Sequence, residues 1–143
     1  MIRFFSQGDE KGIAELEKDC FSHPWSEAAV LESHQNNTLF LLFEEEGRLL
    51  GYAGMQTVLS EGNITNVAVT ASARKKGVGS ALIDALIVYA KEHGISLIAL
   101  EVRESNLAAK RLYEKKGFSA VGIRKRFYSD PTEDAVIMIL EGF

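Results

Sequence analysis

The sequence predicts one α/β domain built on a single sheet with helices on both faces. Strand-like and helix-like segments alternate along the chain, and no repeat, low-complexity segment or flexible linker separates them. A strand over 63–69, a helix over 78–94 and a strand over 95–102 form a crossover unit, whose two strands must be parallel. A chain of 143 residues can bury one substantial core, so residues 1–143 are expected to form a single domain.

Two helices are predicted before the first pair of strands. Asp9 is expected to be the N-cap of the first helix, because its carboxylate can accept hydrogen bonds from the first helical amides. After a break at 23–25, Ser26 is expected to cap a second helix that continues to about His34.

The strands are predicted from alternating apolar residues. The segments 39–43 and 49–56 are joined by the acidic turn 44–47, which predicts an antiparallel pair. The strand over 63–69 changes its two-residue period within 64–67. A β-bulge would explain the change, although a strand buried on both faces has the same pattern. Further strands are predicted over 95–102, 118–123 and 135–140.

Two more helices follow the strand with the irregular period. The first begins at Val78 and ends at Gly94, a residue type that is typical of helix C-termini. The second is opened by Ser105 or Asn106 and closed by Gly117.

Composition and charge exclude several classes of protein. The net charge of −4 does not favour nucleic acid as the main partner. The local basic cluster 124–126 is expected to be a solvated loop edge, and the alternative is that it helps to anchor an acidic partner or a cofactor phosphate. The apolar segments are too short to span a bilayer, and no signal peptide is visible. The single cysteine, Cys20, is expected to be a core thiol, and the three histidines lack metal-ligand spacing. We therefore expect a cytoplasmic protein without a metal.

A basic, glycine-containing loop before the helix at 78 is the feature most indicative of a ligand. It consists of Arg74, Lys75, Lys76, Gly77, Val78, Gly79 and Ser80. Glycine lets the main chain approach a ligand, and the first helical amides can donate to a phosphate. Leu82 stands where a dinucleotide fingerprint needs glycine, and no Gly-Lys-Ser/Thr triphosphate loop is present. The alternative is a turn with a solvated basic face.

Two residues of the second half are candidates for proton transfer. Glu101 is an acidic residue late in the apolar strand over 95–102, and its carboxylate can accept the proton of an ammonium group. Tyr113 lies in the next helix, and its phenol is protonated at neutral pH and can donate a proton. Each also has a structural interpretation, because Glu101 can pair with Arg103 or a neighbouring lysine, and the Tyr113 ring can be buried.

Several motifs together carry a family resemblance. They are Pro24-Trp25-Ser26-Glu27, Asn66-Val67-Ala68-Val69, the loop 74–80, Leu100-Glu101-Val102-Arg103-Glu104-Ser105-Asn106, Leu112-Tyr113-Glu114-Lys115-Lys116-Gly117-Phe118 and Glu133-Asp134-Ala135-Val136-Ile137-Met138. Their order resembles the GNAT family of N-acetyltransferases, and within it the RimI-type enzymes that modify the N-terminal alanine of a small-subunit ribosomal protein. The resemblance covers almost the whole chain. It implies a mixed, mostly antiparallel sheet with a central, splayed parallel strand pair and helices on both faces.

The resemblance also implies roles for individual residues. Glu101 matches the general base and Tyr113 the general acid that protonates the departing thiolate, and acetyl-coenzyme A (acetyl-CoA) is the implied cosubstrate. The implied cofactor-binding residues are Val67, Ala68, Val69, Arg74, Lys75, Lys76, Gly77, Val78, Gly79, Ser80 and Asn106. No metal is implied.

The acceptor is the part of the reaction that the sequence determines least. The resemblance implies the N-terminal segment of a protein, an alanine-start ribosomal protein, with no direct contact to nucleic acid or membrane. An enzyme that acetylates a small amine and a catalytically idle acyl-CoA sensor are the alternatives. The segment 126–133 is shorter than the family's substrate-side loop and carries Phe127 where tyrosine is usual. Tyr128 either lines the peptide slot or is a strand-edge aromatic residue, and the sequence does not indicate the oligomeric state.

Overall fold

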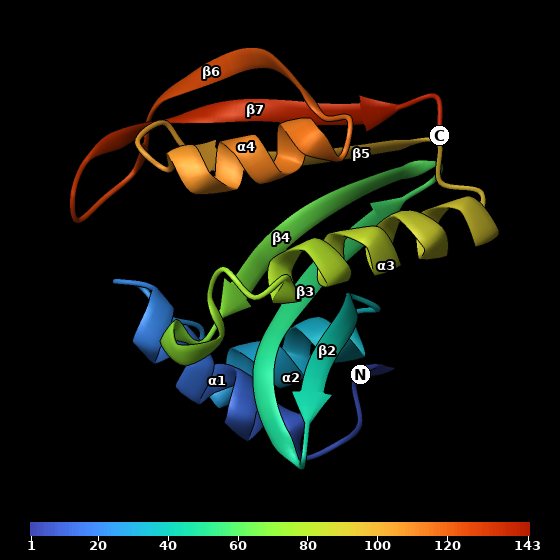
Figure 1. Cartoon of the computed structure of the whole chain (residues 1–143), viewed down its shortest axis with the longest axis vertical. Helices are drawn as coiled ribbons and strands as arrows, with labels where there is room; N and C mark the ends of the chain where they lie inside the picture. Colours follow the sequence, from blue (N-terminus) through green and yellow to red (C-terminus); the bar gives the residue numbers. More distant parts are fainter. The chain divides into compact units, whose positions relative to one another are not determined.

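The computed structural model describes residues 1–143 and contains seven strands and four α-helices (Figure 1). The strands are β1 (Ile2–Phe4), β2 (Leu39–Glu45), β3 (Arg48–Val58), β4 (Glu61–Val69), β5 (Leu97–Arg103), β6 (Ser119–Tyr128) and β7 (Glu133–Glu141). The helices are α1 (Asp9–Cys20), α2 (Glu27–Gln35), α3 (Val78–Glu92) and α4 (Leu107–Lys115), with a short 3-10 helix at Ala71–Ala73. None of them is long and apolar enough to cross a membrane.

All seven strands belong to one sheet with the order β1-β2-β3-β4-β5-β7-β6. The β1–β2, β2–β3, β5–β7 and β6–β7 pairs are antiparallel. The β4–β5 pair is parallel, and its register joins Glu61, Gly62 and Asn63 to Leu97, Ile98 and Ala99. The predicted α/β fold, with one parallel pair in a mostly antiparallel sheet, is confirmed. The splay of this pair and the bulge within 64–67 stay predictions.

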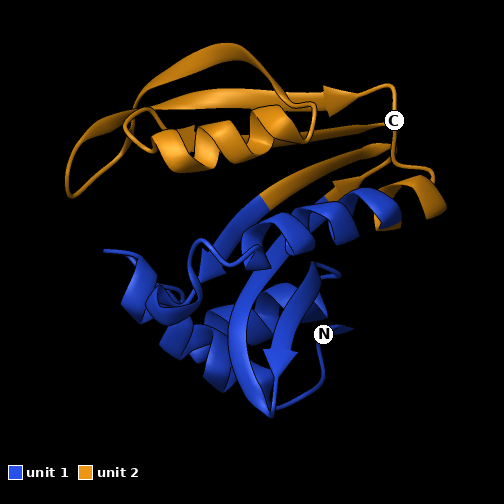
Figure 2. Ribbon diagram, in the orientation of Figure 1, with its two compact units in different colours: residues 1–56, 65–88 blue, residues 57–64, 89–143 orange.

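The chain divides into two compact units (Figure 2). Unit 1 comprises Met1–Gln56 and Thr65–Val88, and unit 2 comprises Thr57–Ile64 and Tyr89–Phe143. The boundaries fall within β3, β4 and α3, so each unit contains a part of these elements. The single domain expected from the sequence stays a prediction.

Helices cover both faces of the strands in unit 1. Successive residues of a strand point to opposite faces, and in β3 the Tyr52 hydroxyl reaches Glu17 of α1. Its neighbour Gly51 faces α3, because a Cβ there would lie 2.9 Å from a Val78 methyl group and 3.3 Å from Leu82. The buried cluster on the α1 and α2 side consists of Ile13, Leu16, Val30, Phe40, Leu42, Tyr52 and Ala68.

In unit 2, one side of the sheet faces α4. Met138 of β7 and Lys110 of α4 line the same concavity, which has a volume of about 440 Å³. Leu100 of β5 is the partner of Met138 in the antiparallel register, so it points to the α4 side as well. Glu101 and Arg103 are the alternate residues of β5 and therefore point to the opposite side.

Three local predictions are wrong for reasons that the tertiary contacts explain. Gly8 is the N-cap of α1, whereas Asp9 is the first helical residue and accepts two hydrogen bonds from Arg3. No strand is predicted at the N-terminus, yet β1 forms there because β2 offers it a partner. The basic cluster 124–126, expected at a loop edge, lies inside β6.

Two predictions that depend on residues close in the chain are confirmed. Ser26 is the N-cap of α2, and its side chain accepts a hydrogen bond from the Ala29 amide at 3.1 Å. The antiparallel pairing of β2 with β3 is confirmed. Its turn is tighter than expected, since β2 continues through Glu45 and only Glu46 and Gly47, both with positive φ, connect the strands.

Candidate active site

The predicted cofactor loop connects β4 to α3 in unit 1. Residues 67–69 end β4, and the chain passes through Ala71–Ala73 before α3 begins at Val78. The Gly77 carbonyl accepts a hydrogen bond from the Ala81 amide at 3.0 Å, so helical bonding starts there. The amides of the first turn of α3 have no helical carbonyl to bond and are available to an anion.

The conformation of the loop leaves open space beside it. Lys75 has a φ of 63° and Gly77 a φ of 84°, the left-handed region that favours glycine. A Cβ on Gly77 would meet no atom within 4 Å. Lys75 and Lys76 are exposed. The main chain and two ammonium groups are therefore accessible to a phosphate.

Close packing under the loop fixes both of its ends. A Cβ on Gly51 would lie 2.9 Å from the Ala68 carbonyl oxygen and 2.9 Å from a Val78 methyl group. Only glycine lets β3 approach both ends of the loop this closely. The Thr70 amide also donates to the Leu50 carbonyl at 2.8 Å. These contacts hold the loop in one conformation, which suits the binding of a pyrophosphate group by main-chain donors.

Arg74 behaves differently from the two lysines. The family resemblance implies that Arg74 binds the cofactor, but its Nε donates to the Val69 carbonyl at 3.1 Å. Its Nη2 lies 3.5 Å from the Cys20 sulfur, which itself lies 3.5 Å from the same carbonyl. Arg74 therefore ties the loop to β4 and α1, and its predicted contact to a cofactor stays a prediction.

In unit 2, Glu101 is a partly exposed carboxylate on β5. Its side chain is 22% exposed, and its Oε1 lies 3.8 Å from the Arg124 Nε of β6. Arg103 forms its ion pair with Glu133, and the cation that pairs with Glu101 is Arg124 instead. One long ion pair leaves the carboxylate able to accept a proton from a bound ammonium group.

Tyr113 comes from the other side of the sheet. Its ring is 7% exposed and packs edge-to-face on Phe118, with the ring centroids 5.7 Å apart. Burial raises the pKa of Tyr113 to about 12, and the electrostatic interaction with Tyr128 contributes a smaller part of this rise. The phenol is therefore a proton donor at neutral pH. Because Glu101 points away from α4, the acceptor and the donor belong to opposite sides of β5 and suit two different reacting atoms.

Tyr128 ends β6 on the Glu101 side of the sheet. Burial and then the negative charge of Glu101 raise its pKa to about 12, while Arg103 opposes this effect. The Arg103 guanidinium carbon lies 4.5 Å from the centroid of the Tyr128 ring, within the range of a cation–π contact. Tyr128 is half-buried at the end of the β6–β7 pairing, opposite Glu133.

Asn106 is the N-cap of α4, as one of the two predicted openings of this helix requires. Its Oδ1 accepts a hydrogen bond from the Ala109 amide at 3.1 Å. The residue is exposed. Its predicted contact to the cofactor stays a prediction.

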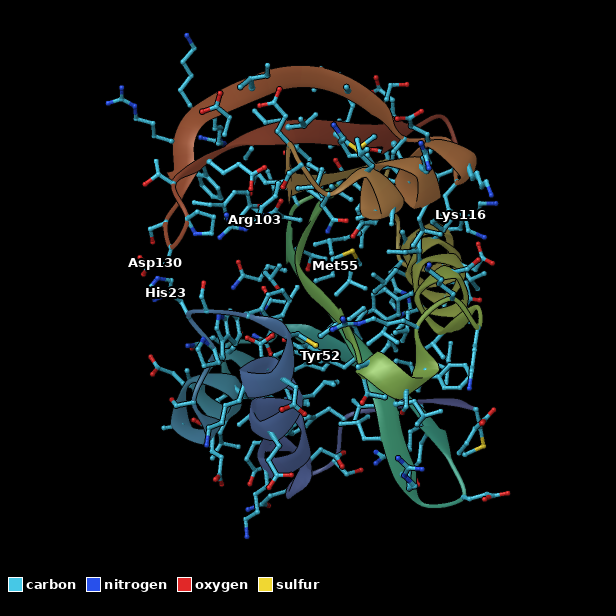
Figure 3. The ribbon with its side chains drawn as sticks, turned by 60° about the vertical axis from the view of Figure 1, so that its left-hand side comes forward. His23, Tyr52, Met55, Arg103, Lys116 and Asp130 are labelled. Atoms are coloured by element: carbon cyan, nitrogen blue, oxygen red, sulfur yellow. The ribbon has the colours of Figure 1, made fainter.

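A buried polar network in unit 1 escapes the sequence reasoning. Glu17 is 1% exposed, and its Oε2 accepts hydrogen bonds from the Tyr52 hydroxyl at 2.6 Å and the Asn66 amide group at 2.8 Å. Its Oε1 accepts from the Trp25 backbone amide at 3.0 Å. Tyr52 lies between β3 and α1 (Figure 3), and its pKa is raised by burial and by the Glu17 charge. The network holds Asn66, which directly precedes the segment 67–69 that is predicted to bind the cofactor.

A sequence signal for this network exists. Glu17 follows Ile13 by four residues and precedes Cys20 by three, so it lies on the apolar face of α1. A carboxylate on such a face needs buried hydrogen-bond donors.

Comparisons with known proteins show which family and which solved structures this chain resembles. Residues 11–118 match the model of the Acetyltransferase (GNAT) family. A [ribosomal protein bS18]-alanine N-acetyltransferase from Haemophilus influenzae is 38% identical over 133 residues, which are 91% of this chain and 90% of the relative. The crystal structure of the ribosomal-protein-S18-alanine N-acetyltransferase from Escherichia coli has a TM-score of 0.92 and 33% identity, covering 99% of this chain and 92% of that one. Ard1 from Thermoplasma volcanium has a TM-score of 0.91 and 28% identity, covering 100% and 97% of the two chains.

Proposed function

Because this chain belongs to the acetyltransferase (GNAT) family, we propose that it transfers the acetyl group of acetyl-CoA to the N-terminal α-amine of a protein. The acceptor that we propose is an alanine-start ribosomal protein of the bS18 type, since relatives with this activity match nearly the whole chain. The enzyme would then work in the cytoplasm, where ribosomal proteins are made. The proposal on the acceptor is supported by similarity, whereas the chemistry is supported by the residues of the site.

The reaction needs one proton acceptor and one proton donor. Acetyl-CoA supplies a thioester, whose C–S bond breaks as the new amide bond forms at the amine. Glu101 takes the proton that the ammonium group must lose, directly or through a water molecule. Tyr113 gives a proton to the departing thiolate, and its raised pKa of about 12 means that the phenol carries this proton at neutral pH. The loop 74–80 holds the pyrophosphate through helix amides and the two lysines.

The observation that carries the proposal is the presence of two proton-transfer groups in unit 2. Glu101 is a carboxylate with one long ion pair, and Tyr113 is a buried, protonated phenol. The first test measures thiol release from acetyl-CoA with peptides that differ only in their N-terminal residue. Mass spectrometry then locates the acetyl group. Alanine-start peptides are expected to be acetylated at the α-amine.

Two other outcomes would contradict the proposed acceptor. Spermidine and an aminoglycoside serve as small-amine controls, and turnover of these alone would assign the enzyme to a small substrate. Tight binding of acetyl-CoA without transfer to any amine would support a sensor.

The two lysines of the loop allow a test of the cofactor site. Replacing Lys75 and Lys76 together by Met is expected to weaken acetyl-CoA binding about tenfold, because charge-assisted phosphate contacts are lost. Calorimetry at low and high salt should show a weaker salt dependence in this variant than in the wild type. Lys11→Met with Lys18→Met is the matched control, since both lysines are exposed on α1. Equal affinities in all three proteins would mean that the loop lysines are only solvated.

A further inference from the structure

One guanidinium group binds both ends of the connection between β6 and β7. The Arg103 Nη2 donates to the Ser129 carbonyl at 3.0 Å, and its Nη1 donates to the Pro131 carbonyl at 2.9 Å. The same Nη1 donates to Glu133 Oε1 at 3.2 Å. Figure 3 labels Arg103 and also Asp130, the residue between the two carbonyls. The β6–β7 connection is therefore fixed to β5 by a side chain rather than by strand pairing.

Glu133 extends these contacts to the start of α4. Its Oε2 accepts a hydrogen bond from the Ser105 backbone amide at 2.6 Å. The Glu104 amide donates to the Asp134 carbonyl at 3.1 Å. Arg103, Ser105 and Glu133 together join the β5–α4 junction to the β6–β7 connection, and we call these three residues the Arg103 clamp.

The Arg103 clamp determines where the Tyr128 ring lies. The ring is 4.5 Å from the guanidinium carbon, and Ser129, the next residue, is bonded to the same group. Arg103 and Glu101 are two residues apart on β5 and point to the same side of the sheet. The ring stacked on Arg103 is therefore held beside Glu101, the proposed proton acceptor.

We propose that Arg103 is a positioning residue for the acceptor amine, acting through Tyr128 and the β6–β7 connection. The inference rests on the proposed function, because it concerns the acceptor side of that reaction. In the proposed reaction Arg103 contacts neither the attacking amine nitrogen nor the thioester carbon. Its guanidinium group makes three hydrogen bonds through its planar N–H donors and one cation–π contact through its face. Lysine provides a single ammonium group in place of the fork and cannot make these contacts at once. If Arg103 contributed only to the stability of the fold, its replacement would leave the affinity for the peptide relative to that for acetyl-CoA unchanged.

The experiment compares Arg103→Met and Arg103→Lys with the wild type in steady-state kinetics. The KM for the alanine-start peptide is expected to rise about tenfold in both variants, with the KM for acetyl-CoA within about twofold of the wild type. Arg111→Met is the matched control, because Arg111 is an exposed arginine on α4, and it should leave both KM values unchanged. In the double variant Arg103→Met with Tyr128→Leu, the two effects on the peptide KM are expected to combine to less than their product, since both substitutions disturb the same ring.

A second readout does not require activity. Hydrogen exchange should become faster at the amides of Ser129, Asp130 and Thr132 in Arg103→Met, while the Arg111→Met control keeps the wild-type rates. If the wild type does not acetylate peptides, the proposed function fails, yet unchanged exchange in Arg103→Met would separately overturn the positioning role. Equal increases of both KM values, or an effect that adds fully to that of Tyr128→Leu, would also overturn it.

Discussion

Replacing Glu101 by Gln is expected to lower kcat about 100-fold to 10,000-fold at pH 7, the range that a positioned general base contributes. Glutamine has nearly the same size but cannot accept the ammonium proton. The affinity for acetyl-CoA, measured by calorimetry, should stay within about twofold of the wild type, since the predicted cofactor loop belongs to unit 1. Glu104→Gln is the matched control, because Glu104 is exposed three residues further along the chain.

The pH dependence gives this prediction a distinctive form. The α-amine of a peptide has a pKa of about 8, so raising the pH to 9 supplies the neutral amine without a base. The deficit of Glu101→Gln should therefore shrink between pH 7 and pH 9. Tyr113 keeps its proton over this range, because its pKa is about 12. The wild type should therefore lose no activity through deprotonation of Tyr113 between pH 7 and pH 9. A deficit that is equal at both pH values would contradict the assignment of Glu101 as the base.

Replacing Glu17 by Ala is expected to lower the free energy of unfolding by about 3 to 5 kcal/mol, because several buried donors lose their acceptor at once. These donors are the Tyr52 hydroxyl, the Asn66 side chain and the Trp25 backbone amide. Chemical denaturation at pH 7 measures the change. Glu15→Ala, at an exposed position of the same helix, should change the stability by about 0.5 kcal/mol or less.

A milder substitution keeps this prediction testable if the alanine variant does not fold. In Glu17→Gln the side-chain oxygen can still accept from the Trp25 amide, but the new amide group faces the Asn66 donor. A loss of about 1 to 3 kcal/mol is expected for this mismatch. A variant as stable as the wild type would mean that the network contributes nothing to folding.

The sequence predicts the local features of this fold well. Ser26 and Asn106 are helix caps as expected, because a cap depends on a side chain and amides only three residues away. The strand–helix–strand crossover and its parallel pair follow from segment lengths and a general rule of handedness. The strand β1 escapes prediction because three residues form a strand only when β2 supplies their hydrogen-bond partners.

The candidate site, like the fold, can be predicted only in part from the sequence. Glu101, Tyr113 and the loop 74–80 can be singled out from residue types and their order, because proton transfer and phosphate binding each need particular groups. The partners of these groups cannot be found in this way. Arg103 could have paired with Glu101, and only the folded β6–β7 connection brings Glu133 to it instead.

What the sequence determined by itself is every strand and α-helix except β1, the fold class, and the chemical groups available for the proposed acetyl transfer. Only the tertiary structure decided that Arg74 turns back to Val69, that Glu17 is buried, and that Arg103 holds the Tyr128 ring. The physical reason is the range of the interactions. Helix caps, turns and strand periods arise between residues close in the chain. Burial, ion pairs and many side-chain hydrogen bonds arise between distant residues, as in the hydrogen bond from Asn66 to Glu17, which lie 49 positions apart. Their free energies exist only after the sheet has brought distant segments together.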